Sequence, residues 1–297
     1  MSGLSLLVSY PKSGNTWVRA LLSSIYSPGG RVDINRLSIK NVADRDAIAS
    51  FSGISTADFS EDEEYRIRFL ALENLARSES ILLKAHEAML PASNPPMLPF
   101  PEHSIRAVVY IVRDPRDVAA SLANHLGVTI DSVIRHMANG EFHLENQRHG
   151  RRPQMSQLLS TWSAHVLSWI DRPHLNVFVV RYENIHANPQ SCFSNMLKFI
   201  GIDVSSEVLV RAINATRFGN LQAQEQEQGF VERPSASKAF FRRGAVNSWV
   251  DTLTREQSDR IVAEHHLVMQ RLGYVAPAPT PVGADHAILE PTPAPPL

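Results

Sequence analysis

The chain is poor in cysteine, has no excess of either charge and contains no long hydrophobic segment. Its single cysteine, Cys192, excludes intrachain disulfides and zinc sites built from several cysteines, and it fits a reducing compartment. The 29 Lys and Arg residues nearly cancel the 30 Asp and Glu residues, so the formal charge is -1 and bulk attraction for nucleic acid or anionic lipid is excluded. No segment approaches the roughly 18 apolar residues of a membrane helix, and residues 4–8 are too short for a signal-peptide core. We expect a cytoplasmic protein that binds neither nucleic acid nor membranes, in which any anion site is local.

The composition is that of a globular protein, except at one end. Apolar residues make up 43% of the chain and charged residues 20%, which is typical of a folded domain. Residues 276–297 contain seven of the 19 prolines, and such a segment cannot hold a helix or a sheet ladder. Because no internal repeat is visible, we predict one domain over residues 1–275 and a disordered, proline-rich tail over residues 276–297.

Four short apolar runs alternate with helical patterns. They cover residues 4–9, 81–84, 107–112 and 177–180. Continuous apolar strands separated by helices indicate a parallel sheet that is covered on both faces. The predicted fold class is therefore α/β, with ligands bound beyond the carboxyl ends of the strands.

Capping residues predict where three of the helices begin. Asp114 and Asn188 each precede a proline, which suits the first position of a helix. Thr254 and Gln257 can form a capping box, and Gly273 can end the helix that follows them.

The loop after the first predicted strand has the features of a phosphate site. Residues 10–17 read Tyr-Pro-Lys-Ser-Gly-Asn-Thr-Trp, and apolar residues at helical spacing follow them. The free amides and the dipole of the first helical turn attract an anion, and Lys12 adds a full positive charge. Gly14 would let the backbone approach a ligand closely, while Ser13 and Thr16 offer hydroxyl donors. For this octapeptide alone, an ordinary strand-to-helix turn with a solvated lysine is the alternative.

An ATP-binding P-loop is disfavoured at this position. That motif places Lys and Ser or Thr directly after the second of two spaced glycines and relies on Mg²⁺. Here Lys12 precedes Gly14, only one glycine is present, and no strand ends in an evident magnesium-holding acid.

Residues 10–17 resemble the 5′-phosphosulfate loop of sulfotransferases that use 3′-phosphoadenosine 5′-phosphosulfate (PAPS). Asn15 stands where the usual form of the loop has threonine, which keeps a polar donor. The resemblance implies a P-loop-like sulfotransferase fold and PAPS as the donor. It also implies that the donor is bound by Lys12, Ser13, Gly14, Asn15, Thr16 and Trp17.

A second anion site is expected after the third predicted strand. Arg113 ends that strand and Ser121 lies on the following helix, where guanidinium and hydroxyl can converge on one anion. Taken alone, an Arg and a Ser at this spacing more often mark the start of a surface helix. Residues 113–121 are similar to the 3′-phosphate motif of the sulfotransferases, which implies that Arg113 and Ser121 hold the 3′-phosphate.

A third element lies at residues 240–249. Arg242 and Arg243 can clamp a phosphate while Gly244 lets the loop fold over it, although a solvated basic turn is the alternative. The segment resembles the family's Arg-Lys-Gly-x-x-Gly-x-Trp-Lys loop, which covers the 3′-phosphate. It differs by having Arg243 for Lys, Asn247 for the second Gly and Val250 for the final Lys.

The resemblance also suggests an adenine site. It assigns the base to aromatic faces, which can stack on a purine, and to one polar contact. These residues are Trp17, Tyr182, Phe218 and Thr216.

His86 follows the second predicted strand and is the candidate general base. A histidine near a phosphate loop can remove a proton from an acceptor hydroxyl near neutral pH. A lone histidine is usually a structural residue, but Lys84-Ala85-His86 resembles the family's Lys-x-His, whose histidine is the general base. We infer in-line sulfuryl transfer in which Lys12 stabilises the departing phosphate oxygen and Lys84 assists at the sulfuryl oxygens. No metal site is predicted, because Leu90 stands where a zincin His-Glu-x-x-His motif needs its second histidine.

The acceptor is narrowed only to a small-molecule alcohol or phenol, a natural product among the possibilities. Residues 29–77 and 126–168 are expected to build its pocket and a lid. The early first strand looks more like bacterial members of the cytosolic-type family, and no oligomeric state is predicted. An ATP-dependent small-molecule kinase and a non-catalytic nucleotide-binding module remain the alternative functions.

Overall fold

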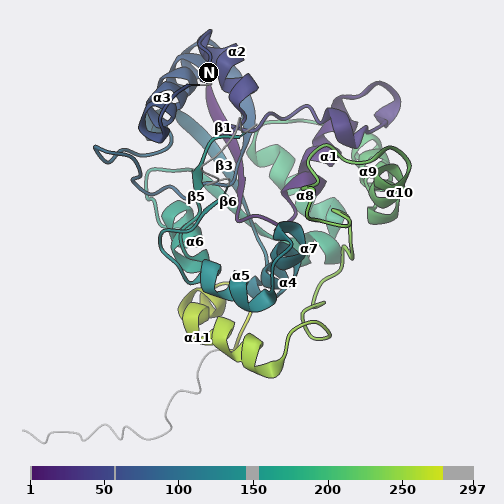
Figure 1. The fold of residues 1–297 in the computed structure, drawn as a ribbon. Helices are drawn as coiled ribbons and strands as arrows, with labels where there is room; N and C mark the ends of the chain where they lie inside the picture. Colours follow the sequence, from purple (N-terminus) through teal and green to yellow (C-terminus); the bar gives the residue numbers. More distant parts are fainter. Residues whose placement is uncertain (1, 57, 145–153, 277–297) are drawn as a thin grey trace, which may run out of the picture.

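A four-stranded parallel sheet forms the centre of the molecule in a computed structural model that describes residues 2–56, 58–144 and 154–276 (Figure 1). The strand order is β2-β1-β3-β6. These strands are β1 (Gly3–Ser9), β2 (Ser80–Ala85), β3 (Ile105–Val112) and β6 (Val177–Arg181), and each contains one of the four predicted runs. The predicted α/β fold class is therefore confirmed. Residues 277–297 of the predicted tail lie outside the described residues.

Side chains alternate across the sheet and enter two separate cores. Leu6 pairs in register with Leu83 and Val108, and these residues belong to the larger core. Leu7 and Val109, one position further along, belong to the core on the opposite face. A sheet whose central strands are buried on both faces requires continuous apolar strands, which is the pattern of the sequence.

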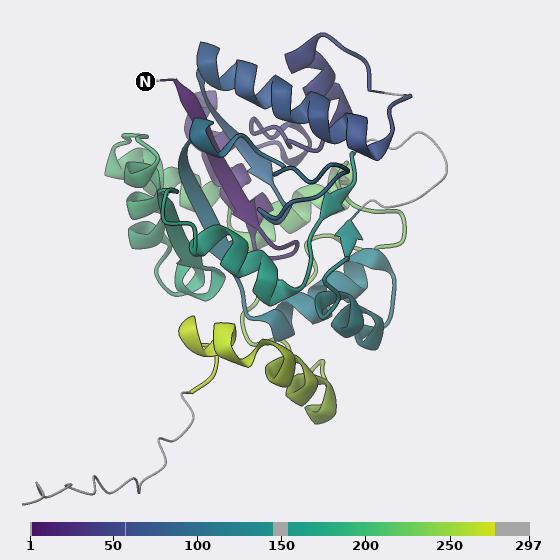
Figure 2. The ribbon, with the colours of Figure 1, turned by 90° about the vertical axis from the view of Figure 1, so that its left-hand side faces the viewer.

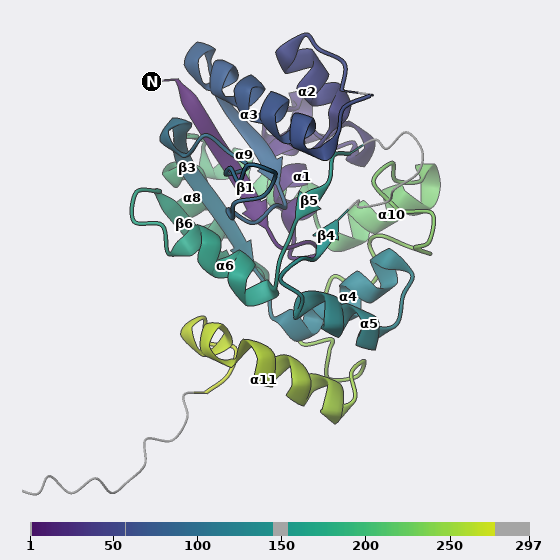
Figure 3. The ribbon, with the colours of Figure 1, turned by 60° about the vertical axis from the view of Figure 1, so that its left-hand side comes forward.

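Helices cover both faces of the sheet (Figures 2 and 3). The helices that contribute to the smaller core are α1 (Asn15–Tyr26), α7 (Tyr182–Ala187), α8 (Pro189–Phe199) and α9 (Ser206–Ala215). The helices that contribute to the larger core are α3 (Glu61–Ser78), α4 (Pro115–Leu126), α5 (Ile130–Met137), α6 (Trp162–Ile170) and α11 (Arg255–Arg271). The remaining elements are α2 (Arg45–Ser52), α10 (Phe218–Gln228), the 3₁₀ turns Pro28–Gly30, Ile34–Arg36 and Glu102–Ser104, and an antiparallel pair of β4 (His143–Leu144) and β5 (Gln157–Leu158). Among the described residues, no helix is long and apolar enough to cross a membrane.

The predicted helix starts are confirmed. The Asp114 side chain accepts a hydrogen bond from the Arg116 amide at the start of α4, and Asn188 caps α8 in the same way. Thr254 and Gln257 form both bonds of a capping box at the start of α11.

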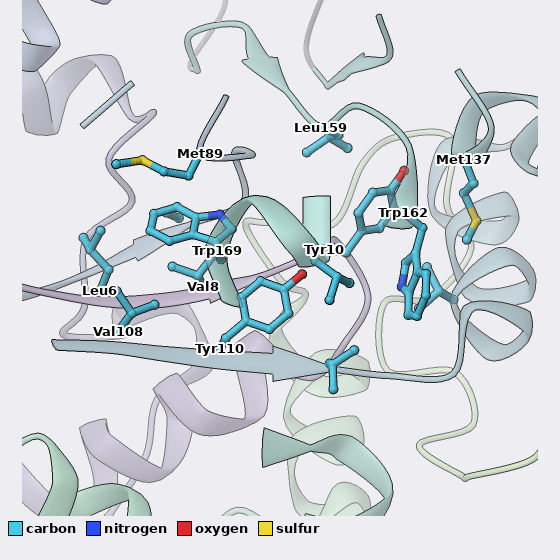
Figure 4. Packing of buried hydrophobic residues seen from close by; sticks show 14 of the residues in the cluster. Leu6, Val8, Tyr10, Met89, Val108, Tyr110, Met137, Leu159, Trp162 and Trp169 are labelled. Carbon is cyan, nitrogen blue, oxygen red and sulfur yellow. The ribbon is translucent and has the colours of Figure 1, made fainter. Parts of the chain in front are cut away.

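Trp169 and Tyr110 pack in the larger core (Figure 4), and polar atoms beside this core hold the chain just after β2 in place. The indole nitrogen of Trp169 donates to the carbonyl of Glu87 at 2.9 Å. His165 Nε2 lies 2.9 Å from the carbonyl of His86, and His165 Nδ1 lies 2.8 Å from the Tyr110 hydroxyl. Side chains of α6, supported by Tyr110 of β3, thus hold the backbone around His86 in place.

A buried ion pair holds the same segment from α3. The carboxylate of Glu87 is fully buried and lies 2.8 Å from Nη1 of Arg68, which is also fully buried. The Tyr65 hydroxyl donates to the same carboxylate at 2.5 Å. A buried charge left without its partner is strongly destabilising, so this pair ties α3 to the end of β2.

Glu87→Gln should lower the free energy of unfolding by about 3–5 kcal/mol, because it leaves the Arg68 guanidinium buried without a counter-ion. Urea denaturation followed by circular dichroism measures this loss. The double variant Arg68→Met with Glu87→Leu should recover most of it, and Asp259→Asn, which removes an exposed partner of Arg255, should leave the midpoint unchanged. A stable Glu87→Gln single variant would show that this pair does not anchor α3.

Candidate active site

One cavity of about 630 Å³ is lined by the loops that follow the strands. Lys12 and Gly14 follow β1, His86 follows β2, Arg113 follows β3 and Tyr182 follows β6. Every residue that the sequence predicts for the site lines this cavity, except Ser13. Parallel strands bring their carboxyl ends to one edge, which explains why loops far apart in the sequence meet here.

The loop between β1 and α1 folds around two left-handed residues. Lys12 has φ of 68° and Gly14 has φ of 105°. A Cβ at Gly14 would lie 2.6 Å from Cδ2 of Tyr182, so only glycine lets this ring lie against the loop. Ser13 is fully buried, and its hydroxyl has no hydrogen-bond partner within the described ranges. An unpartnered buried hydroxyl beside the free amides of a helix start fits a phosphate-sized ligand.

The Asn15 side chain points into the protein. Its amide donates to the carbonyl of Leu7 at 3.1 Å and to the Ser9 hydroxyl at 3.4 Å. The side-chain donor of Asn15, which stands where the usual loop has threonine, is therefore used in hydrogen bonds within the protein. The backbone N–H of Asn15, at the start of α1, remains the group that can face an anion.

The surroundings of Lys12 disfavour its charged form. Burial lowers the pKa of Lys12 to about 7, and the charges of Arg113 and Lys84 act in the same direction. Its Nζ lies 3.6 Å from the centre of the Phe240 ring, a cation–π contact. An anion bound beside Nζ would favour the charged form and raise this pKa.

Arg113 connects the phosphate loop to residues 240–249. Its guanidinium donates to the carbonyl of Lys12 at 3.1 Å and to the carbonyl of Ala245 at 2.9 Å. It also lies 4.4 Å from the centre of the Tyr182 ring. Arg113 Nε is buried without a partner in the described part of the chain, and Ser121 lines the cavity two helical turns along α4. The two corners predicted to bind separate phosphates are thus part of one cavity.

The arginine-rich loop is anchored by Asp117. The two Asp117 oxygens accept hydrogen bonds from the amides of Asn247 and Trp249 at 2.9 and 2.8 Å, and from the Ser248 hydroxyl at 3.0 Å. Asn247, which replaces the second glycine of the motif, has φ of 58°. Asparagine tolerates this conformation better than most residues, so the replacement keeps the turn.

Gly244 is required by the packing of the same loop. It also adopts a left-handed conformation, and a Cβ there would overlap the ring of Phe218. Arg242 and Arg243 line the cavity beside it. The predicted loop and one residue of the predicted adenine site therefore touch.

The remaining aromatic residues of the predicted adenine site form a cluster. The Trp17 and Tyr182 rings are 6.0 Å apart and nearly perpendicular. The indole nitrogen of Trp17 is buried without a partner among the described residues. Thr216 donates its hydroxyl hydrogen to the Ala212 carbonyl at 2.8 Å, which leaves only its lone pairs for a ligand.

His86 is held in one tautomer. Its Nδ1 lies 2.8 Å from the carbonyl oxygen of Ser9, and a carbonyl can only accept, so Nδ1 carries the hydrogen. The lone pair of the neutral ring is then on Nε2. Burial and the charge of Lys84 hold the pKa of His86 well below its usual value, so the ring is neutral at physiological pH. Within the described ranges Nε2 makes no hydrogen bond, and a neutral imidazole of this kind can accept a proton.

Comparison with known proteins assigns the family. The sulfotransferase domain matches residues 4–273. The chain belongs to the sulfotransferase family. The curated relatives include an amine sulfotransferase of Oryctolagus cuniculus, 25% identical over 86% of this chain and 76% of the relative, and sulfotransferase 1A1 of Canis lupus familiaris, 25% identical over 90% and 84%.

Solved structures agree in fold. A mouse sulfotransferase complexed with PAP (adenosine 3′,5′-bisphosphate) has a TM-score of 0.57 at 20% identity, covering 91% of this chain and 85% of its own. A retinol dehydratase in complex with retinol and PAP has a TM-score of 0.56 at 15% identity, with coverage of 90% and 81%. These findings confirm the predicted sulfotransferase fold and enzyme class, and they do not favour the kinase alternative.

The wall of this sulfotransferase cavity differs in part from the expectation. Leu144 and Gln154, from the predicted acceptor segment 126–168, line it. No described residue of segment 29–77 does, so that part of the prediction is wrong; the segment forms α2 and α3 instead. Residues 145–153 of the predicted acceptor segment lie outside the described residues.

Sequence reasoning assigned no role to several charged or polar residues that line the cavity, and four of them matter most for the site. They are Asp117, His125, His186 and Glu232. Asp117 could have been found from the sequence, because it lies on α4 one turn before the predicted site residue Ser121. Burial lowers the pKa of His125 to about 3, and its Nδ1 has no partner within the described residues. Nothing in the local sequence marks His125 or Glu232, because both reach the cavity through the tertiary path of the chain.

Proposed function

We propose that this chain transfers a sulfuryl group from PAPS to a hydroxyl of a small-molecule alcohol or phenol. The observation that carries the proposal is one cavity lined by the two corners that we predict to bind phosphates and by a neutral histidine whose Nε2 has no hydrogen-bond partner among the described residues. When bound, PAPS supplies a sulfuryl group joined to a phosphate that can leave. The retinol held by one solved structure is an alcohol. The lone cysteine further supports a cytoplasmic location.

We assign the first corner to the phosphosulfate end. The first-turn amides of α1 and the ammonium of Lys12 face that end, with Gly14 leaving room for it. Lys12 has the further role of stabilising negative charge on the departing phosphate oxygen. A cation placed before the reaction begins needs no reorganisation in the transition state, which is why this interaction accelerates transfer.

The second corner is assigned to the 3′-phosphate. Arg113, which follows β3, and Ser121, on α4, hold it, and Arg242, Arg243 and Gly244 close over it. Asp117 supports this loop by fixing its backbone. The adenine is assigned to the cluster of Trp17, Tyr182, Thr216 and Phe218.

His86 and Lys84 are assigned to the transferring group. His86 Nε2 takes the acceptor proton as the hydroxyl attacks, and the hydrogen bond from Nδ1 to Ser9 keeps the ring oriented. Lys84, two residues before His86, neutralises charge on the sulfuryl oxygens. The sulfuryl group moves in line from the phosphate oxygen to the acceptor oxygen.

PAP should bind at least about 10-fold more tightly than adenosine 5′-monophosphate (AMP), because a charge-assisted contact contributes about 1.5–3 kcal/mol. Arg113→Ala should weaken PAP about 10- to 100-fold and AMP much less, by isothermal titration calorimetry. The comparison of both ligands separates a 3′-phosphate contact from a general loss of structure, which would weaken both equally.

Arg255→Ala removes an exposed arginine of α11 and serves as the matched control for Arg113→Ala. It should leave the affinities for PAP and AMP unchanged. Equal affinity of the unaltered protein for the two nucleotides would contradict the two-corner assignment.

A further inference from the structure

Glu232 brings a carboxylate to the transfer side of the cavity. It lies in residues 229–241, between α10 and the arginine-rich loop, which line the cavity at several positions. Its two oxygens accept hydrogen bonds from Nη1 of Arg19 at 2.7 and 2.9 Å. Its Oε2 also lies 3.5 Å from Nζ of Lys84. One carboxylate therefore joins this segment to α1 and to β2.

The Arg19 side of this contact is rigid. Arg19 is 4% exposed and lies on α1. Its Nε and Nη2 also donate to the carbonyl of Ile39 at 3.3 and 3.1 Å. A guanidinium fixed in this way presents a planar donor group to Glu232 and sets the position of its oxygens.

The Lys84 side of the contact has no other carboxylate partner within the described residues. The described lining of the cavity contains two carboxylates, Asp117 and Glu232. Asp117 is occupied by the backbone of residues 247–249. Lys84 is 6% exposed, so its ammonium depends on a nearby negative charge to remain protonated.

We propose that Glu232 is a positioning residue for sulfuryl transfer, which holds the charged Lys84 ammonium beside His86 when residues 229–241 are seated on α1. The proposal rests on the proposed function for its role in transfer. While the Arg19–Glu232 contact is made, Lys84 faces the reacting group in the charged form up to a higher pH than it would without Glu232. The position of residues 229–241 in the cavity wall thereby affects the charge of Lys84 at the reacting group.

The charges around Lys84 determine the effect of removing Glu232. Burial lowers the pKa of Lys84 to about 8, and Glu232 opposes this effect most strongly. The charge of Arg19 on α1 lowers the same pKa, and the charge of Asp44, which precedes α2, raises it. The charge of Lys84 also acts on Lys12 and on the histidines 86 and 125. Without Glu232, the Arg19 charge is uncompensated and the pKa of Lys84 falls further. Lysine is charged below its pKa, so the charge is then lost at a lower pH.

The first test measures Lys84 directly. In the full chain, the titration of the Lys84 Nζ resonance is followed by NMR and assigned by its loss in Lys84→Arg. Glu232→Gln should lower the midpoint by about one pH unit, a tenfold loss of proton affinity. Glu232→Asp keeps the charge and should give a smaller shift. Exposed Glu227→Gln, from the end of α10, should give none. An unchanged midpoint in a folded Glu232→Gln would overturn the proposal.

The second test measures transfer from PAPS to a panel of phenols and alcohols between pH 6 and 9. With PAPS saturating, so that the bound donor keeps Lys12 charged, the alkaline limb of kcat/KM for the acceptor should move down by about one pH unit in Glu232→Gln. The limb that Lys84 contributes should be absent in Lys84→Arg, and adding Glu232→Gln to that variant should shift the pH profile no further. If Glu232→Gln lowers the titration midpoint of Lys84 but leaves the alkaline limb in place, the role of Glu232 in transfer would be overturned. If the unaltered protein transfers to no acceptor, the proposed function fails, whereas the NMR shift still supports placement of Lys84 by Glu232.

Discussion

Replacing His86 by alanine is expected to lower kcat about 10²- to 10⁴-fold while the affinity for PAP is unchanged, because loss of a general base has an effect of that size. The Nδ1 bond to the Ser9 carbonyl leaves Nε2 as the proton acceptor. His86→Gln should lose activity similarly, because its amide is not basic. Steady-state rates with saturating PAPS, together with calorimetry for PAP, measure the two quantities separately.

The matched control for His86 is His103→Ala, which removes an exposed histidine that contacts Glu73. It should leave kcat unchanged. The pH profile gives a further check, because His86 must be neutral to accept a proton. Since burial holds its pKa well below 6.5, the acid limb of kcat/KM should lie well below pH 6.5. An acid limb at or above 6.5, or full turnover by His86→Ala, would remove His86 from the role.

The strands and the phosphate loop could be predicted from the sequence because their signals are local. A buried parallel strand is a continuous apolar run, and residues 10–17 contain the loop, its glycine and the start of α1 within eight positions. Arg113 could be named as a candidate because it comes directly after a strand. Parallel connections then bring these loops to one edge without further information.

The supporting residues could not be predicted, because their roles depend on contacts across the chain. Glu232 meets Arg19 across 213 positions, and Asp117 meets Asn247 across 130. A carboxylate in either place reads as an ordinary polar residue until the fold brings its partner near. The prediction that residues 29–77 build the acceptor pocket was wrong for a related reason. The absence of a nucleotide motif does not by itself place a segment at the acceptor. Here Arg68 of α3 pairs instead with Glu87, just after β2.

Lys12→Met is expected to lower kcat about 10²- to 10³-fold, the usual effect of removing one preorganised electrostatic contact to the developing charge. Methionine keeps an unbranched side chain in the wall, so the loss reports the charge. The same residue should link nucleotide binding to protons. Burial lowers the pKa of Lys12 to about 7, and a bound phosphate raises it, so binding above pH 7 takes up a proton. The affinity for PAP should then fall by up to tenfold for each pH unit above 7.

Calorimetry in two buffers of different ionisation enthalpy, at pH 8, counts the protons taken up on binding PAP. The unaltered protein should take up close to one proton through Lys12, with a further fraction through Lys84, whose pKa is about 8. Lys12→Met should keep only that fraction. Lys12→Arg, which stays charged at every accessible pH, should also lose the Lys12 proton but retain tighter binding at pH 8 than Lys12→Met. Equal proton uptake by all three proteins would place the titrating group elsewhere and would separate Lys12 from the phosphate.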